Sequence, residues 1–374
     1  MERLSLVCRI AVLSIALPVL QTVCASSLVG AGETKSGWQT EWEQTLAAAK
    51  KEGRVAIAGP PQAAERGVLM QFQKMYPDIK LEYAGFISTE FFTRIRPERD
   101  ARIHAWDLHI GGLGAATYKV LSEGWFQPIR PRLIFPEVTD DSKWLGGFDA
   151  GFADNKRTYV FAFASYLTYL VKVNRKVVPE SELGSVSGIL DPKWKGKIVV
   201  FDPRTGGAGA LAMAALRQEL GDEAIRKILI DQQPVFSSDK RQVAEWVIRG
   251  RYPIGIGVAD AYLTPFLDEG VGKEVESVKS KVVPISPGSG GLIVMNPAPH
   301  PNATTVFVNW LLSRETQAAW AKEGRTNSRR VDVPPGNPEA VPDRARLSQY
   351  FDANSEEGSR FFGEIVTLAQ RLIK

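Results

Sequence analysis

Cysteine is almost absent from this 374-residue sequence. The two cysteines, Cys8 and Cys24, both lie near the N-terminus, so a chain that loses this segment contains no thiol. Their position excludes a disulfide framework, a thiolate metal site and a cysteine nucleophile from the rest of the chain. A cysteine-free protein suits an oxidising compartment, where stray thiols mispair.

Histidine is nearly as scarce, and its three copies are His104, His109 and His300. The sequence has no Gly-x-Ser-x-Gly elbow and no His, Cys and carboxylate cluster with zinc-like spacing. His104 and His109 flank Asp107 and could form a metal pair, but neutral structural histidines are the favoured interpretation. We therefore expect no enzyme activity, no metal and no cofactor.

Most of the chain also lacks a strong excess of positive or negative residues, and it lacks long apolar runs. The net charge is +4 and is spread along the sequence, without the dense basic stripe typical of nucleic-acid binding. Beyond the N-terminus no stretch is apolar enough to cross a membrane. The 44% apolar and 24% charged fractions are ordinary for a soluble globular protein. At this length, two lobes are expected.

The N-terminus has the three parts of a secretion signal. Met1–Arg9 is positively charged, Ile10–Leu20 is apolar, and Val23-Cys24-Ala25 is a small-residue cleavage site. The apolar part is shorter than the roughly 20 residues that span a bilayer, which disfavours a membrane anchor. Lipidation at Cys24 is a second alternative, for which Val23 is a poor fit. We predict a signal peptide over residues 1–25 and a periplasmic protein.

The rest of the sequence alternates between helical and strand patterns. In the first half, helices are predicted over 38–52, 65–75, 88–103 (with a break or kink at Pro97) and 118–124, and strands over 55–58, 79–83 and 107–110. Strands are predicted again over 197–201 and 254–258, with helices over 209–219, 242–249, 304–312 and 361–373. This alternation predicts βαβ units in open α/β sheets.

The stretch Asp202–Gly209 follows a predicted strand and opens a helix. Free backbone N–H groups at such a place bind anions, and the glycines allow a close approach. The alternative is a tight turn in which Thr205 caps the helix. Gly207-x-Gly209-x-x-Ala212 also matches a dinucleotide fingerprint, which is a weak signal when it stands alone.

Two further polar groups are candidates for a site. Asp260 and Tyr262 follow the strand over 254–258, and on a continuing strand they would share one face. Ligands of open α/β sheets bind beyond such strand ends. Arg329 and Arg330 form either a surface charge pair or an anion clamp.

Several blocks of the sequence resemble the extracellular solute-binding proteins of ABC importers, in particular the iron(III)-binding type. The blocks are 190–198, 202–209, 291–296, 298–303, 307–313 and 324–332. The resemblance implies a two-lobed type II periplasmic binding protein fold, with a hinge between two open α/β sheets. It assigns residues 36–160 and 290–325 to lobe 1 and 161–289 to lobe 2. Residues 326–374 would form a C-terminal helical segment that packs on the lobes.

The resemblance also places ligand-binding residues in an interlobe cleft. Thr205, Gly206 and Gly207 match the family turn that holds an anion, with Arg204 or Arg329 beside it. Tyr262 lies near the place of two adjacent tyrosines in iron binders, but the next residue is Leu263. This departure favours an organic anion over iron. The remaining predicted ligand-binding residues are Pro61, Gln62, Gly112, Ser165, Tyr166, Asp239 and Asp260.

The resemblance thus predicts a monomeric substrate-binding subunit that delivers a small solute to an ABC permease in the cytoplasmic membrane. The first alternative is a ferric iron-binding transport protein, with Tyr262 and Asp260 as metal ligands. The second is an exported enzyme on the same fold.

Overall fold

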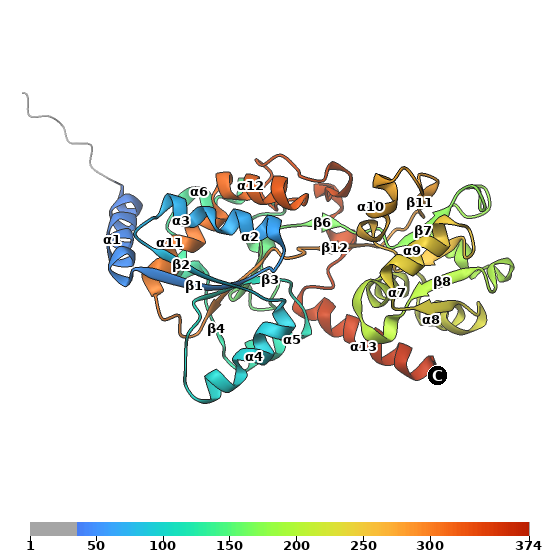
Figure 1. The fold of residues 1–374 in the computed structure, drawn as a ribbon, viewed down its shortest axis with the longest axis horizontal. Helices are drawn as coiled ribbons and strands as arrows, with labels where there is room; N and C mark the ends of the chain where they lie inside the picture. Colours follow the sequence, from blue (N-terminus) through green and yellow to red (C-terminus); the bar gives the residue numbers. More distant parts are fainter. Residues whose placement is uncertain (1–35, 374) are drawn as a thin grey trace, which may run out of the picture. The chain divides into compact units, whose positions relative to one another are not determined.

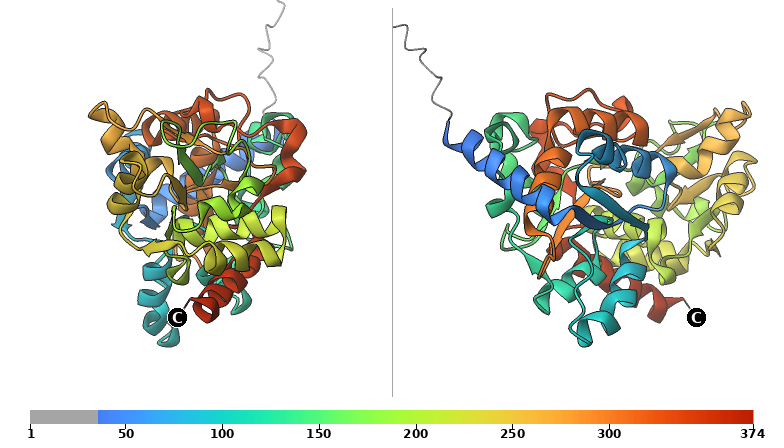
Figure 2. Two further views of the ribbon diagram at one scale, coloured as in Figure 1. Left: turned by 90° about the vertical axis from the view of Figure 1, so that its right-hand side faces the viewer. Right: turned by 60° about the vertical axis from the view of Figure 1, so that its left-hand side comes forward.

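The computed structural model describes residues 36–373, so the predicted signal peptide lies outside the described residues. Within this range no helix combines the length and apolar character of a membrane span. The described chain builds two main sheets and one small sheet. Figures 1 and 2 show the arrangement.

The first main sheet contains β1 (Arg54–Gly59), whose sequence RVAIAG is buried after its first residue. The strand order is β2 (Lys80–Gly85), β1, β3 (Leu108–Gly111), β13 (Gly291–Met295) and β4 (Phe126–Gln127), and β5 (Val160–Ala162) also pairs with β13. The strands β2, β1 and β3 are parallel, whereas β13 runs antiparallel to β3. The carboxyl ends of three strands therefore meet at one edge.

Helices cover both faces of this sheet. One apolar core contains residues of α1 (Gly37–Glu52), α2 (Ala63–Leu69), α3 (Gln71–Met75) and α11 (Pro301–Leu312). The other contains residues of α4 (Ser88–Asp100) and α5 (Ala115–Ser122). Short helices α6 (Pro136–Thr139) and α12 (Arg314–Gly324) complete this half of the chain.

The second main sheet has the order β11 (Val275–Ser277), β7 (Val171–Asn174), β10 (Ile254–Ile256), β8 (Ile198–Phe201) and β9 (Val235–Ser237). Here β9, β8 and β10 are parallel, so they also share a carboxyl edge. The helices of this half are α7 (Gly207–Leu220), α8 (Asp222–Arg226), α9 (Lys240–Ile248), α10 (Asp260–Asp268) and the C-terminal α13 (Glu356–Leu372). Residues of α7 and α13 share one core, and those of α9 and α10 share another.

The small sheet has three strands. Two of them, β6 (Tyr166–Leu167) and β12 (Val283–Ser286), lie on the two stretches that connect the main sheets, and β14 (Tyr350–Phe351) pairs with β12. The chain leaves the first sheet through β6 and returns through β12, as Figure 1 shows. The α/β prediction and the two-lobed architecture are confirmed; the lobe boundaries that the sequence suggested stay a prediction.

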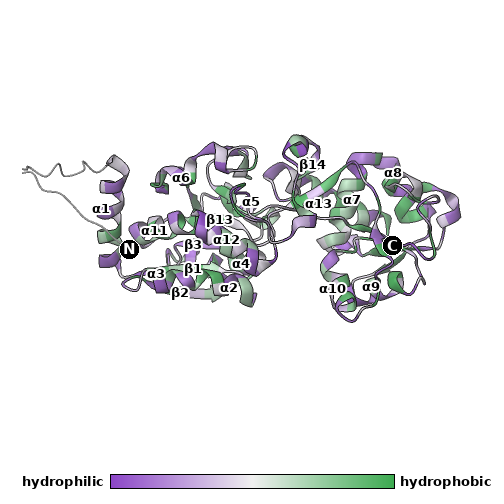
Figure 3. Ribbon diagram, turned by 90° about the horizontal axis from the view of Figure 1, so that it is seen from above, coloured by the Kyte–Doolittle hydropathy of each residue, from purple (hydrophilic) through white to green (hydrophobic). Residues whose placement is uncertain are grey.

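Three local predictions were wrong. The helix expected over 65–75 is two helices that meet at Met70. Pro97 does not break α4, because it lies in the last turn, and the helix forgoes only the one hydrogen bond that an N–H at this position would donate. The C-terminal helix begins at Glu356, five residues before the predicted start, because Ser355 caps it by accepting a hydrogen bond from the Gly358 N–H. Figure 3 shows polar and apolar residues mixed along the helices. In α13 the buried residues Ile365 and Ala369 are four positions apart, which fits a helix with one face on the core.

Candidate functional site

A cavity of about 300 Å³ lies at the carboxyl edge of the first sheet. The turns after β1, β2 and β3 line it, together with Ser289 from the turn between β12 and β13. Its lining residues are 60–62, 86–89, 111–117 and Ser289. None of them carries a charged side chain. We call this cavity the lobe-1 pocket.

Three helices begin at the lobe-1 pocket without a side-chain cap. The N-cap positions are Gln62 for α2, Ile87 for α4 and Gly114 for α5. The first amides of a helix have no acceptor within the helix, so an uncapped start leaves them for another group. With the positive end of the helix dipole, the 13-residue α4 and the eight-residue α5 direct partial positive charge at the pocket.

The side-chain hydroxyl of Thr117 also lacks a hydrogen-bond partner within the described residues. This residue of α5 lines the pocket and is 1% exposed. Because nearly all buried polar groups in proteins are paired, the unpaired hydroxyl marks Thr117 as a candidate contact for a group that enters the pocket.

A hydrogen-bonded chain runs behind the pocket wall. Nδ1 of the buried His109 lies 3.1 Å from the carbonyl oxygen of Ala58, and Nε2 lies 2.8 Å from Ser88 Oγ. Ser88 Oγ lies 2.6 Å from the carbonyl oxygen of Gly112. Burial lowers the pKa of His109 from 6.5 to about 4, so the ring is neutral at pH 7. A β-carbon on Gly111 would lie 2.8 Å from His109 Nε2, which explains the glycine there.

A second cavity, of about 340 Å³, is lined by residues from both halves of the chain. Tyr166, Pro287 and Ser289 come from the connecting stretches, Asp260 from α10 and Arg325 from the end of α12. Ser289 also lines the lobe-1 pocket, so the two cavities adjoin. We call this second cavity the interlobe pocket.

Asp260 does not face the interlobe pocket as a free carboxylate. Its Oδ1 accepts a hydrogen bond from the ammonium group of Lys172, a β7 side chain that is 3% exposed. Lys172 also donates to Ser277 Oγ at 2.8 Å. The expectation that Asp260 and Tyr262 lie on a continuing strand was wrong, because both belong to the first turn of α10.

Most residues of the Asp202–Gly209 turn in the second lobe have contacts within the protein that explain why they are there. Arg204 folds back on Asp202, with a 2.7 Å contact that holds the pKa of this carboxyl below its usual range. The helix N-cap is Gly206, with φ of 84°, so the alternative in which Thr205 caps α7 was wrong. A β-carbon on Gly209 would lie 1.8 Å from the carbonyl oxygen of Phe201, so this glycine serves helix-to-strand packing.

The other predicted residues of the second lobe lie at the same carboxyl edge. Asp239 caps α9 by accepting a hydrogen bond from the Gln242 N–H. Tyr262 is half-buried, its ring packs 5.7 Å from that of Phe201, and burial raises its pKa. Neither residue lines the lobe-1 or the interlobe pocket.

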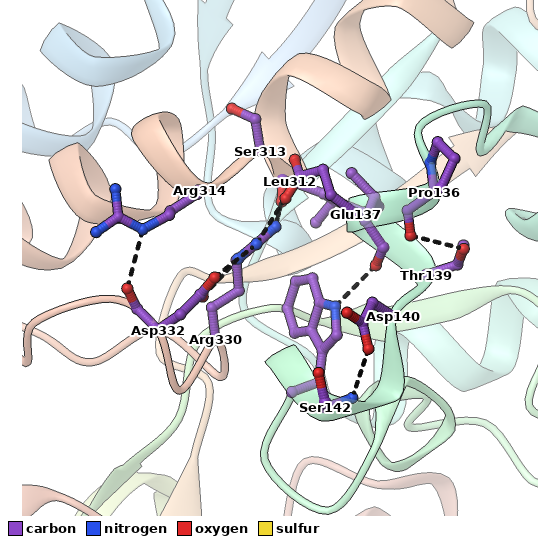
Figure 4. Close-up of polar contacts among 12 residues, drawn as sticks. Pro136, Glu137, Thr139, Asp140, Ser142, Leu312, Ser313, Arg314, Arg330 and Asp332 are labelled. Carbon is purple, nitrogen blue, oxygen red and sulfur yellow. Dashed lines mark hydrogen bonds and ion pairs between the residues drawn. The ribbon is translucent and has the colours of Figure 1, made fainter. Parts of the chain in front are cut away.

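The arginine pair near the C-terminal end is structural. Arg329 is 8% exposed and donates to the carbonyl oxygen of Leu145, and burial lowers its pKa. Arg330 contacts Asp332 at 3.0 Å and Glu137 at 2.6 Å (Figure 4). Neither lines the two pockets, so the sequence-based anion clamp at Arg329 does not form there.

The structure therefore divides the predicted site residues into three groups. Pro61, Gln62 and Gly112 line the lobe-1 pocket, and Tyr166 and Asp260 line the interlobe pocket. Those outside both pockets are Ser165, Arg204, Thr205, Gly206, Gly207, Asp239, Tyr262 and Arg329. Sequence reasoning missed Ser88, Thr117 and Ser289; only Ser88 had a signal, as a helix start after the second strand.

Residues 137–326 match the model of a protein family described as bacterial extracellular solute-binding protein. The chain belongs to this family. The predicted family of extracellular solute-binding proteins is thereby confirmed. The family is one of solute-binding proteins and not of enzymes.

Solved structures of the same fold are only distantly related in sequence. A Trichodesmium protein in complex with iron and citrate is 16% identical, with a TM-score of 0.63 over 86% of this chain and 99% of that chain. Iron-bound HitA from Pseudomonas aeruginosa has 16% identity and a TM-score of 0.60 over 86% and 99%. An ABC transporter structure from Clostridium perfringens has 14% identity and a TM-score of 0.64 over 86% and 99%. A search of curated proteins gave no match.

Proposed function

We propose that this periplasmic solute-binding subunit carries a small organic anion to its permease. The anionic group would enter the lobe-1 pocket, and the rest of the molecule would extend past Ser289 into the interlobe pocket. Type II binding proteins close around their ligand by a hinge motion, and the closed form differs in the surface it offers a partner. The monomeric state expected from the sequence belongs to the same proposal.

The lobe-1 pocket is the observation that carries this proposal. Uncapped starts of α4 and α5 provide main-chain N–H donors, and the buried Thr117 hydroxyl has no partner. A negatively charged oxygen group would accept hydrogen bonds from such donors, and charge-assisted hydrogen bonds are about twice as strong as neutral ones. None of the residues that line this pocket is a lysine or an arginine, so uncharged donors alone would hold the anion, which limits the affinity.

The described residues provide poorer ligands for ferric iron than for an organic anion. Iron(III) needs hard anionic oxygen ligands, yet Asp260 is already paired with Lys172, and burial raises the pKa of Tyr262 and thereby opposes the tyrosinate form. Among residues 36–373 no group of three His, Cys, Asp or Glu side chains is arranged to hold a metal. The iron named for the Trichodesmium and Pseudomonas proteins keeps this cargo as the alternative to test.

A thermal-shift screen of the purified mature protein tests the proposal. The panel would contain carboxylates, phosphate esters, phosphonates and sulfonates, with uncharged sugars and ferric citrate as comparisons. We expect at least one organic anion to raise the melting temperature, since a ligand at 100 times its Kd stabilises by about 2.7 kcal/mol. Stabilisation by ferric salts alone, or by uncharged solutes alone, would contradict it.

A further inference from the structure

We propose that anion binding in the lobe-1 pocket is coupled to the uptake of one proton by His109, through Ser88. This inference rests on the proposed function, since it concerns the same pocket. It adds a pH dependence of binding that the family membership does not supply. Its basis is a count of the protons available to the chain that links Ala58, His109, Ser88 and Gly112.

Three short contacts in this chain require three protons. Ala58 O and Gly112 O at its two ends are carbonyl oxygens, which only accept. A neutral imidazole has one N–H, and Ser88 has one O–H, so two protons serve three contacts. Ser88 donates its proton to Gly112 O at 2.6 Å, so a neutral ring that is protonated on Nε2 donates to Ser88 Oγ. Nδ1 then faces Ala58 O at 3.1 Å with no proton between them.

Protonation of the ring completes the chain. An imidazolium donates from Nδ1 to Ala58 O and from Nε2 to Ser88 Oγ, so all three contacts then have a proton. Ser88 and Gly112 both line the pocket, so the charge on the ring lies one hydrogen bond behind the pocket wall. The neutral ring leaves the Ala58 contact without a proton, whereas the charged ring completes this contact and adds a positive charge that favours an anion in the pocket.

Among residues 36–373, the acidic group nearest to His109 in the sequence is the buried carboxylate of Asp107, which is paired with His300. The ring is buried between Phe91 and Phe92 of α4, and the neighbouring strand positions are Ala58 on β1 and Ile293 on β13. None of these residues is titratable, and the low pKa arises from burial, opposed only by the Ala58 hydrogen bond. An anion in the pocket would therefore provide a counter-charge that no residue packed against this ring supplies.

The linkage has a definite sign. Without ligand the pKa of His109 is about 4. A bound anion raises it, so between the two values binding takes up one proton, and affinity falls by up to about tenfold for each unit that the pH rises. Sulfate is a suitable probe because its charge is constant over this range, whereas phosphate titrates.

The experiment is an NMR titration of histidine-labelled protein with and without saturating sulfate, from pH 4 to pH 8. Three histidines in the chain make the assignment simple. We expect sulfate to raise the pKa of His109 by at least one unit and to leave His104 and His300 unchanged. The variant Ser88→Ala keeps the main-chain donors but removes the link, so the sulfate-induced shift should shrink. His104→Gln is the matched control and should keep it.

Three outcomes decide the matter. A raised pKa that depends on Ser88 supports the linkage. Sulfate-dependent shifts of the pocket amides of α4 and α5 without a change at His109 would overturn the linkage and leave the proposed function standing. Failure of sulfate and of every anion in the thermal-shift panel to bind would overturn both.

Discussion

The Lys172 ammonium group is almost fully buried, and its counter-charge is Asp260, whose side chain is 65% exposed. The pair joins β7 to the first turn of α10 and so fixes the chain segment that follows β10. A carboxylate at the wall of a proposed anion site would repel the ligand, and Lys172 neutralises it. The pair therefore serves both the fold of the second lobe and the electrostatics of the cleft.

Asp260→Asn should destabilise the protein by about 1–3 kcal/mol, because a buried ammonium loses its anionic partner. Ser277 still accepts one hydrogen bond from Lys172, which limits the loss. Urea unfolding measures the change. Asp268→Asn at the exposed end of the same helix is the matched control, and removing a carboxylate there should be neutral or slightly stabilising. Equal stability of both variants would contradict this role of the pair.

Thr117→Val should weaken binding of the identified anion by about tenfold and leave stability unchanged or slightly higher. The substitution keeps the shape of the side chain and removes a hydroxyl whose oxygen has no partner within the described chain. Isothermal titration calorimetry gives the affinity. Thr93→Val, on the exposed side of α4, is the control and should bind as the wild type does. A wild-type affinity for the Thr117 variant would remove this hydroxyl from the site.

Gly209→Ala should cost more than about 3 kcal/mol of unfolding free energy, because its β-carbon would lie 1.8 Å from a backbone oxygen that cannot move freely. Gly363→Ala in α13 has no atom within 4 Å of the added carbon. Since alanine favours a helix over glycine, this control should stabilise by about 0.5–1 kcal/mol. Thermal unfolding compares the two variants. If Gly209→Ala were as stable as the control, the assigned packing role would be wrong.

Stability of the unliganded protein should fall as the pH drops from 6.5 towards 4. The folded state keeps His109 neutral down to a pKa of about 4, whereas the unfolded chain protonates it near 6.5. In that window the unfolded state binds more protons, so acid favours unfolding, by at most about 3 kcal/mol from this residue. His109→Asn should flatten this part of the stability curve, measured by urea unfolding at each pH. An unchanged curve would mean that another group causes the acid sensitivity.

Tyr262→Phe should leave anion affinity within about threefold, because burial keeps the phenol protonated and the ring itself packs on Phe201. Tyr262→Ala removes that ring and should destabilise the edge of the second lobe. Iron–tyrosinate complexes absorb visible light, so we expect the wild type to stay colourless after ferric loading. A visible band that disappears in Tyr262→Phe would instead support iron as cargo.

The fold was predictable because local patterns and burial agree. Residues 55–58 form an apolar run that ends at a Gly-Pro-Pro turn, and the structure places it in the buried strand β1, between β2 and β3 of the first sheet. The early pocket residues Pro61, Gln62 and Gly112 were also predictable, because turns after parallel strands meet at one edge.

The side-chain partners were not predictable. Arg204 and Arg329 suggested anion binding as charges in a sequence, but Arg204 folds onto Asp202 two residues away, and Arg329 is buried against Leu145. Thr117 had no local signal, since its importance comes from burial without a partner. Such facts depend on the three-dimensional placement of each side chain, which composition and periodicity do not record.

The most direct test of an anion site in the lobe-1 pocket is a crystal structure with selenate, located by its anomalous scattering. The account predicts a peak within hydrogen-bond distance of Thr117 Oγ1 and of the first amides of α4 and α5. A peak at the Asp202–Gly209 turn with an empty lobe-1 pocket would contradict it.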